Sequence, residues 1–187
     1  MLSSRKHMAR RSQPAISNNL FAFTDKLGLQ VNLAGTGDTN RVEVERALLL
    51  ADFAFRTLAP LILVQARLPQ EAKVLRACSP ITEQYSAKGA TAVVCRMRDI
   101  THTLAQQAHA RGDFDAATKT FATAALTNIA SICWGAGTAA TKADAGYSLN
   151  CVVAVAEAIT KAIAAGIPEQ ELLDLVVDVV ADAMVMR

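Results

Sequence analysis

The chain has 187 residues, 52% of them hydrophobic and 19% charged, with a formal net charge of +2. This length predicts one ordinary domain, and the excess of apolar side chains predicts contacts with other subunits. The four cysteines form no CxxC pair, which argues against a zinc ribbon, and the apolar stretches carry charges, which argues against a membrane span.

The N-terminal residues 1–19 are basic and contain no acidic residue. Their fixed positive charges lie close together: Arg5, Lys6, Arg10 and Arg11. This composition predicts an extended basic arm, followed by a single α-helical domain over 20–187. The arm favours contact with nucleic-acid phosphates or with an acidic protein surface, and the alternatives are a solvated tail and a targeting segment.

The first long helix is predicted to follow a turn. Glycines and an aspartate at 35–38 indicate the turn, and Asn40 with Glu43 has the spacing of a capping box. Apolar residues then recur as far as Val64, and Pro60 predicts a kink in this helix. Within it, the aspartate at 52 and the arginine at 56 lie four residues apart, so we expect them to pair on one helix face.

Prolines and a glycine divide the middle of the chain. Pro69 predicts the start of a short helix that ends near Cys78. Ser79-Pro80 then predicts a new helix, with proline in its first turn, that runs to about Ala110. The Arg-Gly-Asp sequence at 111–113 predicts the end of that helix and the N-cap of the next one.

Small residues dominate the second half of the chain. The next helix is predicted to contain Phe114 and Phe121 and to meet an interruption at 135–137, where the sequence reads Gly-Ala-Gly. We expect helix again over 138–165, ended by Gly166. The closely spaced alanines and glycines predict helix backbones that approach one another closely.

The last predicted helix runs from Pro168 to about Met186 and is apolar around most of its circumference. Its acidic side chains recur every three or four residues: Glu171, Asp174, Asp178 and Asp182. We refer to these four residues as the acidic stripe. Five acids and one arginine give residues 166–187 a net charge of −4, and five bases and one aspartate give residues 1–30 a net charge of +4. This asymmetry indicates partners and assembly.

These elements predict an all-α protein, a compact bundle of about five or six helices with the extended basic arm at its N-terminus. All four cysteines lie in apolar helical surroundings: Cys78, Cys95, Cys133 and Cys151. We therefore expect four buried free thiols and a reducing compartment, either the cytoplasm or the interior of a virion.

Candidate catalytic and metal-binding residues are sparse. Asp99 and His102 form one Asp-x-x-His pair, and His109 follows seven residues later, whereas a di-iron bundle needs two Glu-x-x-His motifs and further carboxylates. The sequence contains no nucleophile elbow and no phosphate-binding loop. The prediction is therefore no cofactor, no metal and no catalytic residue.

The leading hypothesis is a non-enzymatic helical subunit of a larger homo-oligomeric assembly, such as a viral or phage shell or tube or a comparable scaffold. In this hypothesis the basic arm and the acidic stripe mediate contacts between subunits. The second hypothesis is a binding module that associates with nucleic acid through its arm or inhibits a basic partner with its acidic helix. The third is a small helical metalloenzyme built around Asp99, His102 and His109.

Overall fold

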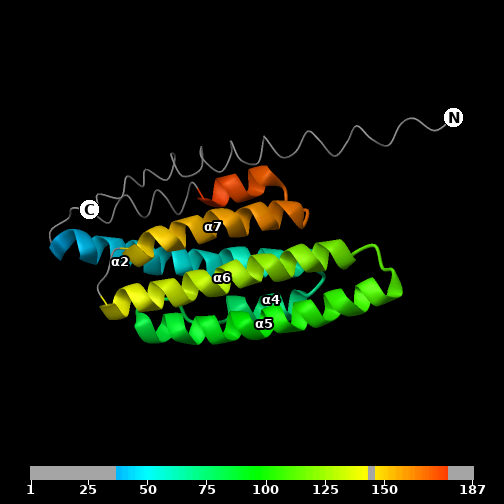
Figure 1. Cartoon of the computed structure of the whole chain (residues 1–187), viewed down its shortest axis with the longest axis horizontal. Coiled ribbons are helices and arrows are strands. Elements are labelled where there is room, and N and C mark those ends of the chain that lie inside the picture. The colour runs from blue at the N-terminus through cyan, green and yellow to red at the C-terminus, as the bar shows by residue number, and fades with distance from the viewer. Residues whose placement is uncertain (1–36, 143–145, 177–187) are drawn as a thin grey trace. The chain divides into compact units, whose positions relative to one another are not determined.

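Helices form the described part of the chain (Figure 1). The structure is a computed structural model that describes residues 37–142 and 146–176, and no strand occurs in these two ranges. The helices are, in chain order, α2 (Gly37–Phe53), η1 (Ala54–Leu58), α3 (Ala59–Gln65), α4 (Pro69–Arg76), α5 (Gln84–Arg111), α6 (Ala116–Lys142) and α7 (Gly146–Ala164). Residues 169–176 are also helical. The predicted all-α, multi-helix bundle is confirmed.

A continuous run of helix formed by α2, η1 and α3 passes through Pro60. Proline has no N–H group, so it cannot donate the α-helical hydrogen bond to the carbonyl group four residues before it. The structure has a π-helical turn, η1, just before Pro60, and the chain continues as helix through the proline. The predicted helix start is wrong, because α2 already includes Gly37 and Asp38. Both residue types are tolerated in a first helical turn, where the N–H groups have no helical partner.

Two helix ends in the middle of the chain lie close to their predicted positions. α4 begins at Pro69 and ends at Arg76, just before the expected Cys78. α5 ends at Arg111, and Gly112 follows with a left-handed backbone (φ 71°) that a side chain would strain. These ends were predictable because proline and glycine act locally: proline fixes its own φ, and glycine tolerates the left-handed backbone that follows a helix.

The start of α5 differs from the prediction at Ser79-Pro80. The helix begins at Gln84, where Glu83 and Ser86 cap each other's backbone N–H groups reciprocally. The N–H of Ile81 donates a hydrogen bond of 2.8 Å to Oδ1 of Asp52 on α2. The residues before α5 are therefore held by a carboxylate of another helix, which the local sequence does not reveal.

The central helix, α6, runs through residues 135–137 without interruption, so the predicted break is wrong. A Cβ atom at Gly135 would lie 3.1 Å from Sγ of Cys151 on α7, and one at Gly137 would lie 3.3 Å from Cβ of Ala87 on α5. The glycines thus allow α5 and α7 to pack closely on α6. In Figure 1, α6 lies between these two helices, and it also contacts α2 and α3.

The aromatic residues predicted for the start of α6 are not both helical. Phe114 lies in the turn before α6 and is 86% exposed. The guanidinium carbon of Arg67 lies 5.2 Å from the centre of the Phe114 ring. Phe121 does lie on α6 and is partly exposed.

All four cysteines are free, but only two are buried. Cys133 and Cys151 lie in the core, and burial raises the pKa of each thiol to about 12. Cys78 and Cys95 are half-buried, which corrects the prediction of four buried thiols. Cys78 follows the last turn of α4, and Cys95 follows the buried Val94 on α5, so it lies at the flank of the core-facing side.

The predicted end of α7 is confirmed. The helix ends at Ala164, and Gly166 adopts a φ of 103°. A Cβ atom at Gly166 would lie 2.8 Å from Nε2 of Gln65, the end of a flexible, exposed side chain that can move away, so it is the positive φ that favours glycine here. The boundary predicted between residues 19 and 20 lies outside the described residues.

Among the described residues, one stretch, Arg41–Gln65, is long and apolar enough to cross a membrane. However, 67% of its most apolar window is buried by the rest of the chain. Within it, Nε and Nη2 of Arg56 donate to the two carboxylate oxygens of Asp52 at 2.8 and 2.7 Å, as their spacing predicted. A helix in the core of the bundle accounts for these features.

Candidate functional site

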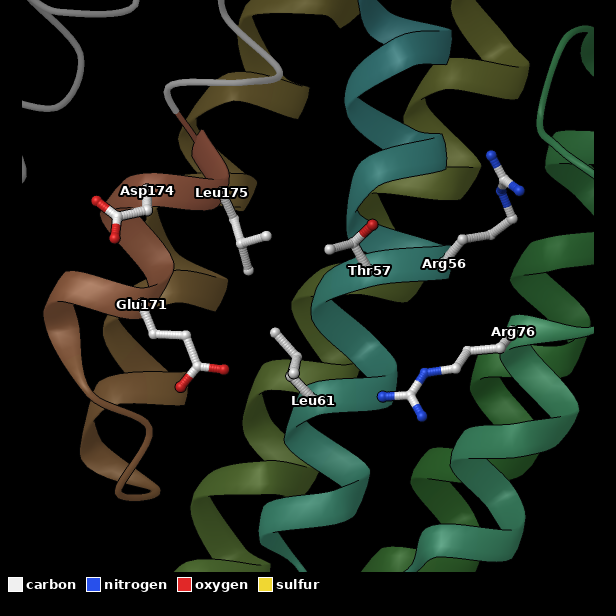
Figure 2. Close-up of a pocket in the computed structure, with 7 residues that line it drawn as sticks. All are labelled: Arg56, Thr57, Leu61, Arg76, Glu171, Asp174 and Leu175. Atoms are coloured by element: carbon white, nitrogen blue, oxygen red, sulfur yellow. The ribbon is translucent and has the colours of Figure 1, made fainter.

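An open groove of about 420 Å³ lies between three helical segments (Figure 2). Its walls come from η1 and α3, from the end of α4, and from the helical residues 169–176. Seven residues line it: Arg56, Thr57, Leu61, Arg76, Glu171, Asp174 and Leu175. The segments are distant in the sequence, so only the tertiary structure brings this set together.

Opposite charges face each other across the groove. Figure 2 shows the guanidinium of Arg76 and the carboxylate of Glu171 extending inward from opposite walls. Both side chains are exposed, and neither forms an ion pair with another residue in the described ranges. Arg76 and Glu171 are therefore a cation and an anion that extend into the groove and that a bound molecule can reach.

The second arginine of the groove is already occupied. Arg56 makes its two hydrogen bonds to Asp52, and in Figure 2 its guanidinium points away from the side chains of Leu61 and Arg76. The hydrogen bond with Asp52 raises the pKa of Arg56, so its charge is permanent. Its role in the groove is to form part of the wall.

The centre of the groove is apolar. Leu61 and Leu175 point toward each other from facing segments in Figure 2, and both are half-buried. Thr57 adds a hydroxyl group beside them. The lining thus combines charged rims with an aliphatic centre, an arrangement that recognises charge and shape.

The acidic stripe is described for its first two members only. Glu171 and Asp174 are exposed, whereas Leu172 and Val176 on the same helix are buried. Asp174 accepts a 2.7 Å hydrogen bond from Nε2 of Gln170 and points away from the groove centre in Figure 2. The other two members of the stripe, Asp178 and Asp182, lie outside the described residues, as do the four basic residues of the arm: Arg5, Lys6, Arg10 and Arg11.

The histidine hypothesis gains no geometric support. His102 and His109 are both exposed on α5, and Nε2 of His109 lies 3.1 Å from Oγ1 of Thr120. Asp99 accepts hydrogen bonds from the neighbouring Arg98. Within the described residues, no three His, Cys, Asp or Glu side chains come together in a way that could hold a metal ion.

An exposed tryptophan and a half-buried tyrosine form a second surface, which sequence analysis missed. Trp134 on α6 is 59% exposed, and its ring packs edge-on against Tyr147 of α7 with the centroids 6.3 Å apart. The Nζ of Lys142 lies 3.1 Å from the hydroxyl of Tyr147. A helical projection would have revealed Trp134, since Thr127, Ser131 and Thr138 share its face at three- and four-residue spacing.

In comparisons with protein-family models, characterised proteins and solved structures, none matches this chain.

Proposed function

We propose that this protein is a non-enzymatic helical subunit of a larger homo-oligomeric assembly, a shell, tube or comparable scaffold. The observation that carries the proposal is Trp134, which is 59% exposed on the central helix. Tryptophan is enriched at the energetic centres of protein interfaces, where its large ring becomes buried against a partner. The partner is a second copy of the chain, since 52% hydrophobic residues are more than one small domain needs.

The hydroxyl groups around Trp134 support the same surface. Oγ1 of Thr127 donates to the carbonyl of Thr123 at 3.0 Å, Oγ of Ser131 to that of Thr127 at 3.2 Å, and Oγ1 of Thr138 to that of Trp134 at 2.9 Å. These donors already have partners within α6, so the loss of water at an interface would leave none of them unsatisfied. Burial of this helix face therefore costs little free energy, because the side chains around Trp134 are small and their hydroxyl groups already donate hydrogen bonds within α6.

Charged residues would orient the subunits. Glu171 and Asp174 are exposed, so a neighbouring copy can reach them, and the basic arm supplies the opposite charge. Exposed ion pairs contribute only about 0–1 kcal/mol each, so apolar burial at the Trp134 surface supplies most of the affinity. The charges determine which faces meet.

Native mass tests this proposal. Light scattering of the full chain at micromolar concentration should give a multiple of the monomer mass, and Trp134→Glu should reduce that mass. Gln106→Glu is the matched control, because it adds the same charge at an exposed position of α5. A monodisperse monomer for the unaltered chain, or equal effects of the two variants, contradicts the proposal.

A second candidate function is association with nucleic acid. The observation that favours it is the cluster of Arg5, Lys6, Arg10 and Arg11, which could neutralise phosphates and release counterions. Deletion of residues 1–13 should then abolish nucleic-acid binding and its dependence on salt while the native mass is unchanged. If the deletion lowers the native mass and the unaltered chain binds no nucleic acid, the arm serves assembly alone.

A further inference from the structure

We propose that the groove of Figure 2 binds a small organic zwitterion, a molecule with an ammonium group and a carboxylate joined by an aliphatic spacer. The carboxylate of the ligand meets Arg76, the ammonium group meets Glu171, and the spacer lies over Leu61 and Leu175. This site is separate from the Trp134 surface and goes beyond the proposed assembly function. It shares Glu171 with the acidic stripe, so a ligand and the basic arm of a neighbouring copy would compete for that carboxylate.

The charges are the first step of the argument. Arg76 and Glu171 extend toward each other from opposite walls, and neither has an ion-pair partner within the described part of the chain. Guanidinium binds carboxylate through two parallel hydrogen bonds, and a carboxylate accepts several hydrogen bonds from an ammonium group. One ligand with both groups satisfies both side chains at once.

The other charged residues of the groove also favour a zwitterion over a dianion or a dication. Arg56 is occupied by Asp52 through two hydrogen bonds, and Asp174 is bonded to Gln170 and points away. Asp174 keeps its charge, because the amide of Gln170 is neutral, but its carboxylate points away from the groove centre, so one positive and one negative group extend inward. A dianion or a dication would place one of its charges against a residue of like charge, whereas a zwitterion would not.

The space between the charges fits the spacer. Leu61 and Leu175 face each other from two segments and provide an apolar centre, with the hydroxyl of Thr57 beside it. The volume of about 420 Å³ lies within the range of small-molecule sites, about 300–1,000 Å³. Because the groove is open to solvent, we expect weak binding, with a dissociation constant on the order of 1 mM.

The experiment is an NMR titration of the full chain with linear ω-amino acids of increasing length, from glycine upward. Amide shifts near Leu61 and Glu171 should saturate most tightly at one intermediate length, where both charges are reached. A linear alkylamine and a linear alkanoate of that length should each bind at least about tenfold more weakly, since each has lost one charged contact. Equal binding of all lengths, or of the amine alone, would overturn the proposal.

Single variants test the two charged residues. Arg76→Gln and Glu171→Gln should each weaken binding of the best ω-amino acid by about tenfold or more. Arg96→Gln and Glu157→Gln are the matched controls, since both change exposed residues outside the groove, and they should leave the affinity unchanged. If the variants in the groove bind as well as the controls, these charges do not recognise the ligand.

A charge exchange distinguishes recognition from damage to the fold. In the double variant Arg76→Glu/Glu171→Arg the groove keeps one charge of each sign, and an ω-amino acid can bind in the reverse direction. We therefore expect the double variant to bind within a few-fold of the unaltered chain, although each single variant is weak. Loss of binding in a folded double variant would refute the model of two opposed charges.

Discussion

The carboxylate of Asp52 joins two parts of the fold, and its removal tests how the segment before α5 is held. The carboxylate accepts hydrogen bonds from Nε and Nη2 of Arg56 and a third from the N–H of Ile81, all between 2.7 and 2.8 Å. Its side chain is only 18% exposed, and Ile81 is buried. Asp52→Ala leaves this N–H without its acceptor in a place that water reaches poorly.

The loss of stability caused by Asp52→Ala has two parts, the hydrogen bond to Ile81 and the ion pair with Arg56. A hydrogen bond to a charged group contributes about 1.5–3 kcal/mol, and a partly exposed ion pair within one helix contributes about 0.3–0.5 kcal/mol. We therefore expect Asp52→Ala to lower the free energy of unfolding by about 2–4 kcal/mol. Arg56→Ala removes the ion pair but keeps the bond to Ile81, so it should cost about 1 kcal/mol or less.

Urea unfolding followed by circular dichroism measures these differences. For a chain of this length a loss of about 3 kcal/mol lowers Tm by about 6–12 °C. Asp52→Asn should be intermediate, because the amide oxygen still accepts the N–H of Ile81 while the charge is lost. If Asp52→Ala costs no more than Arg56→Ala, the bond to Ile81 does not anchor the segment and the reasoning is wrong.

The remaining predictions concern glycines within helices and the two buried cysteines. Gly89→Ala should stabilise the chain by about 0.5–1 kcal/mol, because Gly89 lies inside α5 and its added Cβ would meet no other side chain or neighbouring helix within 4 Å. Gly137→Val should destabilise the chain by about 1–3 kcal/mol, because it overpacks the contact with α5. Equal effects of the two variants in urea unfolding would contradict the close packing. Burial raises the pKa of Cys133 and Cys151 to about 12 from the ordinary value of 9.0, so the stability they contribute is complete below about pH 9 and is lost as the pH rises toward 12. The free energy of unfolding, measured between pH 9 and 12, should decline less steeply in the double variant Cys133→Ala/Cys151→Ala. In the native chain, a thiol reagent should modify the other two cysteines first.

Much of the helical framework was predictable because its signals are local. Pro69 begins a helix because its ring fixes φ at a helical value, and Gly112 ends one because glycine readily adopts a positive φ. The ion pair between Asp52 and Arg56 follows from a spacing of four residues on one helix. The exposed part of the acidic stripe, at Glu171 and Asp174, also follows from helical spacing alone.

The errors lie where a distant segment replaces a local signal. Gly135 and Gly137 read as a helix break in the sequence, but α5 and α7 pack against them, and the tertiary contacts outweigh the low helix propensity of glycine. The start of α5 was misplaced for two reasons. The local cap formed by Glu83 and Ser86 was missed, and the N–H of Ile81 has its acceptor on α2, which no pattern around Pro80 reveals.

The amino-acid sequence determined that this chain is helical, where most of its described helices end, and which side chains along one helix pair. Only the tertiary structure decided that Arg76 and Glu171 face each other across an apolar groove. The physical reason is range: capping, proline, glycine and four-residue spacing act within a turn or two of helix. Which faces meet depends on the simultaneous packing of all the helices, to which each residue contributes only a small part.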